Sequence, residues 1–181
     1  MDSLIPASSG LPNLHPALVH FPLALVPAAL LFDLLLLFAP RRSWLDRAAT
    51  SLWCLAAGGA FAAVRAGEAA RASLAPLAPE VRSLLREHDR LGSQSLWTLA
   101  AIAGVRGLLT WRDMRTDVVP RDFLRFVLLA AGAGALLLLA STADHGGRLV
   151  YQHAVAVTPQ PAPVPAPSVA PPTAAPGAGG P

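Results

Sequence analysis

Residues 123–143 read FLRFVLLAAGAGALLLLASTA, a run in which Arg125 is the only charged side chain. A helix rises about 1.5 Å per residue, so about 20 apolar residues cross the hydrocarbon core of a bilayer. A helix also satisfies its own backbone hydrogen bonds, which lipid cannot do. The run is therefore predicted to be a transmembrane helix.

Three further apolar runs precede it, at about 17–38, 44–64 and 93–111. The composition agrees with a membrane protein: 14% of the residues are charged, whereas soluble domains carry about 25%. The sequence therefore predicts an all-α membrane protein with four transmembrane helices in a bundle. Gly132 and Gly134 are interpreted as packing positions, because small residues let membrane helices approach closely.

The sequence divides into three parts. Residues 1–13 form an N-terminal extension, and residues 14–157 form the four-helix domain. Residues 158–181 are uncharged and contain nine prolines. Proline interrupts both helices and sheets, so this part is predicted to be a disordered tail.

The charges that flank the runs predict the orientation. All 14 basic residues are arginine, which indicates a GC-rich bacterial genome. Seven arginines and four aspartates lie in or beside the two short connections, whereas six arginines and six acidic residues lie on the other side. Basic residues in short loops mark the cytoplasmic side. The expected location is the bacterial inner membrane, with the lipid bilayer around the helices and both termini periplasmic.

Two charges, Asp33 and Arg106, lie inside the apolar runs. Asp33 precedes Phe38 by five residues, and Arg106 precedes Trp111 by five residues. Both runs have the same direction in this topology, so the two charges lie at the same depth. Charges within a membrane are usually paired. The sequence therefore predicts a structural ion pair, and the alternative is that the two side chains reach the cytoplasmic interface separately.

Four histidines are expected at the periplasmic ends of the runs: His15, His20, His88 and His145. His153 follows them. His88 lies on an apolar helical stripe rather than among the neighbouring charged residues. His145 is followed by two glycines, which are predicted to end the fourth helix in a left-handed turn.

Three interpretations of these histidines are open. In the first, two or more of them bind b-type haem, and Arg65, Arg90 or Arg148 pairs with its propionates. In the second, they bind a transition metal, with carboxylates from Glu68, Asp89 or Asp144. In the third, they cap helix ends, and the protein is a cofactor-free subunit or scaffold.

Other function classes find no support in the sequence. It contains no phosphate-binding glycine loop, nucleophile elbow or HExxH motif, so no catalytic residues are assigned. No basic helix or aromatic platform indicates nucleic-acid binding. The single cysteine, Cys54, excludes a disulfide framework within the chain.

Two motifs resemble those of a family of uncharacterised bacterial membrane proteins. They are HPALVHFPLAL at 15–25 and GGRLVYQHAVAV at 146–157, and the family carries HPxxVHFPxAL and GGxLVYxHGVGV. Ala154 and Ala156 replace two glycines of the second motif. The resemblance implies a four-helix inner-membrane domain of unknown activity. Relatives joined to Rieske-type or cytochrome c domains imply a redox protein as partner. The expected function is a membrane subunit or anchor domain that accompanies an electron-transfer system, and the alternative is a haem- or metal-binding membrane protein.

Overall fold

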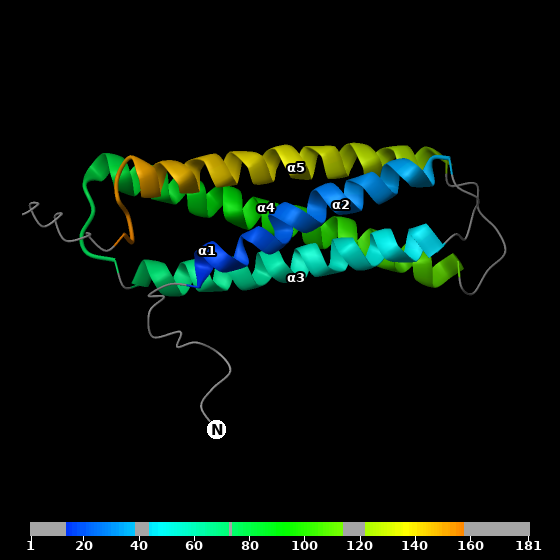
Figure 1. Cartoon of the computed structure of the whole chain (residues 1–181), viewed down its shortest axis with the longest axis horizontal. Coiled ribbons are helices and arrows are strands. Elements are labelled where there is room, and N and C mark those ends of the chain that lie inside the picture. Colours follow the sequence, from blue (N-terminus) through cyan, green and yellow to red (C-terminus); the bar gives the residue numbers. More distant parts are fainter. Residues whose placement is uncertain (1–13, 39–43, 73, 114–121, 158–181) are drawn as a thin grey trace, which may run out of the picture.

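The computed structural model describes residues 14–38, 44–72, 74–113 and 122–157. These residues form the helices α1 (His15–Leu18), α2 (His20–Leu36), α3 (Trp44–Ala72), α4 (Pro79–Asp113) and α5 (Asp122–Tyr151) (Figure 1). No strand occurs in these ranges. The all-α prediction is therefore confirmed for the described part of the chain, while the N-terminal extension and the proline-rich tail lie outside it.

α1 and α2 form one nearly continuous rod. Val19 separates them but keeps right-handed helical dihedral angles. Pro22 has no amide hydrogen to donate to the Leu18 carbonyl, which weakens the helix at this point. The N-terminal motif HPALVHFPLAL therefore forms the first turns of the first long helix.

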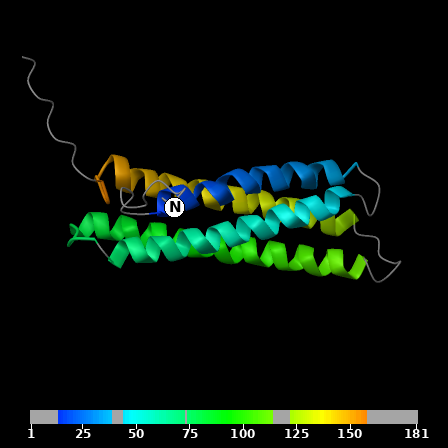
Figure 2. The ribbon, with the colours of Figure 1, turned by 60° about the horizontal axis from the view of Figure 1, so that its bottom comes forward.

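The four rods form an antiparallel bundle, as Figures 1 and 2 show from two directions. α2 packs against α3 and α5, and α4 packs against the same two helices. Among the described residues, α2 makes no close backbone contact with α4, nor α3 with α5. α2 and α4 are therefore diagonal and run in the same direction, so their side chains can meet only along the bundle axis.

Three helical segments are long and apolar enough to cross a membrane: His15–Leu36, Trp44–Ala72 and Phe123–Tyr151. They correspond to three of the four predicted spans. α4 does contain the predicted span 93–111, but it does not reach the same hydropathy. Polar residues at 93–95 and Arg106 reduce the apolar character of this helix. A fourth span therefore stays a prediction.

Small and medium-sized side chains fill the core, which includes Val26, Ala56 and Leu99 around the fully buried Trp53. Large apolar side chains such as Phe61 cover the outside of the bundle. An apolar exterior is typical of a bundle that lies in lipid.

The prediction that α5 ends after His145 is wrong. The helix continues through Gly146 and Gly147 to Tyr151, and neither glycine has a positive φ. The left-handed residues are Ala154, with φ 47°, and Ala156, with φ 59°. These are the two positions at which the resembling family has glycine. Alanine is strained in this conformation because of its Cβ atom, whereas glycine is not.

Candidate functional site

Asp33 on α2 and Arg106 on α4 meet on the bundle axis. Their side chains form an ion pair, and only 3% and 6% of the two side chains is exposed. The two residues come from diagonal helices, so their contact crosses the bundle axis near one end. Removing Arg106 would leave the buried Asp33 carboxylate without a cation.

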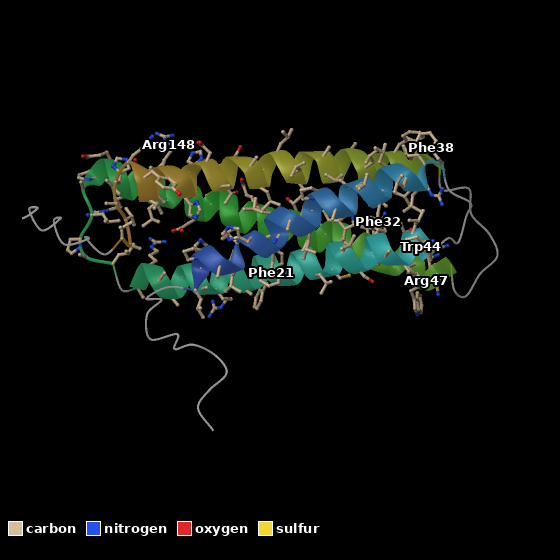
Figure 3. The ribbon with its side chains drawn as sticks, viewed as in Figure 1. Phe21, Phe32, Phe38, Trp44, Arg47 and Arg148 are labelled. Atoms are coloured by element: carbon tan, nitrogen blue, oxygen red, sulfur yellow. The ribbon has the colours of Figure 1, made fainter. Side chains whose placement is uncertain are left out.

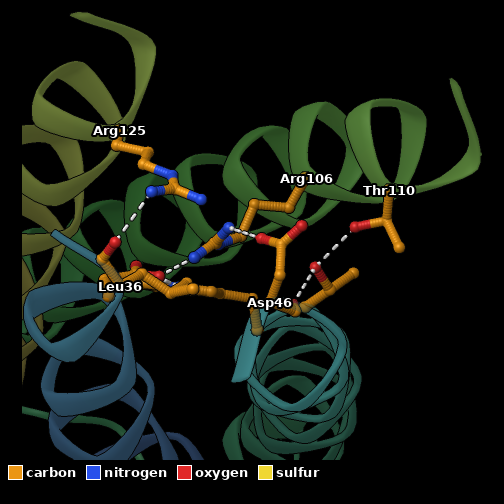
Figure 4. Close-up of polar contacts among 8 residues, drawn as sticks. Leu36, Asp46, Arg106, Thr110 and Arg125 are labelled. Atoms are coloured by element: carbon orange, nitrogen blue, oxygen red, sulfur yellow. Dashed lines mark hydrogen bonds and ion pairs between the residues drawn. The ribbon is translucent and has the colours of Figure 1, made fainter. Parts of the chain in front are cut away.

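Two further charged residues, Asp46 and Arg125, complete this charge cluster, which we define as Asp33, Asp46, Arg106 and Arg125 (Figure 4). Asp46 lies 3.3 Å from Nη1 of Arg106. Arg125 donates a hydrogen bond of 2.8 Å to the carbonyl of Leu36, in the last turn of α2. Carbonyls at a helix C-terminus lack partners within the helix and attract cations.

Trp53 fixes the orientation of the Asp33 carboxylate. Its indole Nε1 donates a hydrogen bond of 2.8 Å to Asp33 Oδ2, and both residues are buried. Nearby, the hydroxyls of Thr50 and Thr110 lie 2.9 Å apart and join α3 to α4. Sequence reasoning placed Asp33 and Arg106 at one depth but missed Trp53 and Asp46. Trp53 lies on the helix after that of Asp33, and no sequence pattern connects the two residues.

His15 and His88 meet at the opposite end of the bundle, and we call them the histidine pair. Their ring centroids lie 6.0 Å apart, and the ring planes are nearly perpendicular at 86°. In Figure 3 Arg148 marks this end, while Phe38, Trp44 and Arg47 mark the end with the charge cluster. His15 begins the first rod and His88 lies on α4, so the pair also joins diagonal helices.

Each ring of the histidine pair is held by a backbone carbonyl of a neighbouring helix. Nδ1 of His15 lies 2.7 Å from the Ala63 oxygen, and Nδ1 of His88 lies 3.0 Å from the Thr142 oxygen. A carbonyl can only accept, so Nδ1 donates in both cases. In the neutral ring the lone pair is therefore on Nε2. Metal-binding histidines are oriented in the same way.

A glycine makes room for each of these rings. A Cβ atom at Gly67 would lie 3.0 Å from Nδ1 of His15, and one at Gly146 would lie 3.0 Å from Cε1 of His88. Each glycine comes one helical turn after the carbonyl to which the ring is bonded. Gly146 thus leaves space for the His88 ring and does not form a turn that ends the helix.

The other histidines are bonded within their own helices. Nδ1 of His20 lies 2.6 Å from the Pro16 oxygen, and Nδ1 of His145 lies 2.8 Å from the Ser141 oxygen. Both contacts reach back by one helical turn, and His153 is exposed beyond α5. The structure therefore brings together two of the four candidate ligands, and it gives His20 and His145 local contacts.

Burial lowers the pKa of His88, which precedes the predicted span of α4. The neighbouring His15 and His145 lower it further, while the hydrogen bond to Thr142 and the charge of Asp89 act in the opposite direction. The ring is therefore neutral at physiological pH, which is the form that binds a metal.

The candidate propionate partners are exposed arginines that have contacts of their own. Arg65 pairs with Glu68, Arg90 lies 3.5 Å from Glu87, and Arg148 lies 3.5 Å from Gln152. Among the candidate metal carboxylates, Asp89 pairs with Arg71 at 2.6 Å. Within the described ranges, no group of three or more His, Cys, Asp and Glu side chains could hold a metal ion.

The fold and these contacts define a helical membrane protein with a histidine pair at one end and a charge cluster around a buried ion pair at the other. The chain belongs to the family described as "Predicted membrane protein (DUF2231)", whose profile matches residues 11–159. The family resemblance noted in the sequence is thereby confirmed. No curated protein and no solved structure matches the chain.

Proposed function

We propose that this chain is a membrane subunit of a bacterial electron-transfer system in which His15 and His88 hold a b-type haem. The observation that carries the proposal is the pair itself: two imidazoles 6.0 Å apart, each held through Nδ1 by a neighbouring helix. Haem iron takes axial imidazole ligands of this kind. Bundles commonly bind such cofactors between facing helices.

The spacing of the rings fits a metal between them. A metal–nitrogen bond is about 2 Å long, and Nε2 lies about 1 Å from the ring centre, so two axial imidazoles have centres about 6 Å apart. The observed separation is 6.0 Å. The separation of the ring centres thus equals that of two imidazoles that share one metal.

The number of ligands favours haem over a bare ion. A structural zinc ion takes four protein ligands, whereas the histidine pair offers two. Haem iron needs only two, because the macrocycle supplies the others. Bound haem would provide one-electron chemistry, while the protein would orient the ligands and exclude water. For the propionates, Arg65, Arg90 or Arg148 would have to exchange its present contact with Glu68, Glu87 or Gln152 for the haem carboxylate.

The test is the visible spectrum of the full-length protein, expressed with haem supply and purified in detergent. We expect a Soret band with α and β bands on reduction. H15A and H88A should each abolish the low-spin signal, whereas H20A and H145A should retain it. Because the ring planes are nearly perpendicular, the ferric protein should give a highly anisotropic low-spin EPR signal. A featureless spectrum together with no bound metal would leave the cofactor-free scaffold as the function.

The proposal includes four spans and periplasmic termini. α4 packs between α3 and α5 and buries Ser95 and Arg106 inside the bundle, which supports its crossing with the other helices. The arginine-rich connections at 39–43 and 114–121 support a cytoplasmic position for that end. Both connections lie outside the described residues.

Enzyme fusions test this orientation. Alkaline phosphatase is active only in the periplasm, so a fusion after Val157 should be active and a fusion within residues 114–121 inactive. Green fluorescent protein at the same two sites should give the opposite pattern. Activity at 114–121 with none after Val157 would reverse the orientation.

A further inference from the structure

The two diagonal helices carry equivalent residues at one constant spacing. His88 lies as far along the chain from His15 as Arg106 lies from Asp33. The first pair meets at one end of the bundle axis and the second pair at the other. One shift in residue number therefore relates both axial contacts.

The other two helices are related in the same way. Gly146 lies as far along the chain from Gly67 as Arg125 lies from Asp46. This second spacing is larger than the first because the chain is longer between Arg106 and Arg125 than between Asp33 and Asp46. Asp46, in the first turn of α3, contacts Arg106 on α4. Arg125, in the first turn of α5, contacts the carbonyl of Leu36 on α2.

The same two spacings superimpose most of the buried positions. Four buried residues of α2 coincide with four of α4, and four of α3 coincide with four of α5. The coinciding pairs are Pro22 with Ser95, Val26 with Leu99, Ala29 with Ile102, Asp33 with Arg106, Ala49 with Leu128, Trp53 with Gly132, Ala56 with Ala135 and Ala60 with Leu139.

The arrangement in space follows this correspondence. α2 and α4 are diagonal and parallel, as are α3 and α5. Half a turn about the bundle axis therefore exchanges the first two long helices with the last two. The same half turn exchanges the surroundings of His15 and His88. Each ring contacts a carbonyl on a neighbouring helix, and a glycine lies one turn further along that helix.

We infer that the four helices are two copies of one helical hairpin joined in tandem, and that the histidine pair is a single binding site made of two equivalent half-sites on the two-fold axis. Each half-site consists of a histidine, a carbonyl and a glycine. The site takes one ligand with two equivalent faces, such as a metal with an open axial position on each side. That ligand rests on the proposed function, whereas the duplication does not.

The two hairpins differ at positions whose side chains contact the other hairpin. The first copy carries the acids Asp33 and Asp46, and the second carries Arg106 and Arg125 at the equivalent positions. The indole of Trp53 occupies the space beside Gly132, its own counterpart. Two first copies would bring Asp33 against a second carboxylate, so the charges favour the pairing of unlike halves.

Exchanging the charges between equivalent positions tests the duplication. In full-length protein, D33R/R106D reverses the axial pair but places the new aspartate at position 106 beside Asp46. The quadruple variant D33R/D46R/R106D/R125D exchanges all four residues of the charge cluster and restores an opposite charge at position 46. We expect its thermal midpoint to recover most of the loss seen in the double variant. Adding W53G/G132W moves the indole to the equivalent position and should raise the midpoint further. A quadruple variant no more stable than the double would overturn the inference.

Cross-linking tests the same symmetry with mild substitutions. Thr50 and Thr110 touch between α3 and α4, and their equivalents are Leu129 on α5 and Leu37 at the end of α2. In a C54A background, T50C/T110C and L37C/L129C should both form disulfides on oxidation, whereas the diagonal pair T50C/L129C should not. A cross-link in the first pair with none in the second would reject the two-fold relation.

The half-sites are tested through their glycines. G67A and G146A each place a methyl group against one imidazole, so the two variants should weaken the haem spectrum to a similar extent. A loss confined to one of them would reject equivalent half-sites. If the unmodified protein binds no haem, the proposed function fails, while the charge exchange and the cross-links still decide the duplication.

Discussion

Replacing Arg106 by glutamine is expected to lower the free energy of unfolding by about 3–5 kcal/mol, because it leaves the buried Asp33 carboxylate without its cation. Asp33 is 3% exposed and is held at its other oxygen by Trp53, so it cannot turn towards water. Replacing Asp33 by asparagine should have a similar cost, since Arg106 keeps only the weaker contact with Asp46.

Thermal or denaturant unfolding in detergent measures both losses. The double variant D33N/R106Q should lose less than the sum of the single losses, because neither buried charge is then left alone. Arg65→Gln is the matched control: its pair with Glu68 is exposed, and exposed pairs contribute about 0–1 kcal/mol. Strictly additive losses would show that the axial pair contributes no coupling.

Alanine at Gly132 is expected to cost about 1–3 kcal/mol through overpacking. Its Cβ would lie 2.8 Å from Cζ2 of Trp53 and 2.7 Å from Cδ2 of Leu30. The leucine methyl can move, but Trp53 is fully buried and bonded to Asp33. The clash therefore moves α5 or breaks the hydrogen bond that orients Asp33.

Gly134 provides the control on the same helix, because a Cβ there meets nothing within 4 Å. Gly134→Ala should be neutral or slightly stabilising, since alanine favours helix by up to about 1 kcal/mol over glycine. Combining Gly132→Ala with Trp53→Phe should recover part of the loss by removing the clashing ring atoms. Equal unfolding midpoints for the two alanine variants would contradict this packing.

The sequence predicts the helices well because lipid requires long apolar runs, which are visible without any knowledge of contacts. Its limits appear in side chains that act across helices. Gly132 and Gly134 look alike in the sequence, yet only Gly132 packs closely against another helix. Gly146 resembles a helix stop but lies beside His88 inside α5.

The candidate site is only partly visible in the sequence for the same reason. Four histidines share one end, but periodicity does not show which helices are diagonal. The structure separates His15 and His88, which are bonded across helices, from His20 and His145, which are bonded within their own. Equal depth indicated that Asp33 could reach Arg106, whereas the contributions of Trp53 and Asp46 depend on the rotation of α3.

The backbone contacts of the histidine pair also determine how protons would follow electrons there. Each Nδ1 proton is already donated to a carbonyl, of Ala63 or of Thr142, and the burial of His88 opposes uptake of a second proton. With Nε2 given to the redox centre of the proposed function, neither imidazole of the histidine pair would have a nitrogen left to take up a proton. The pair would therefore suit the transfer of electrons without an accompanying transfer of protons.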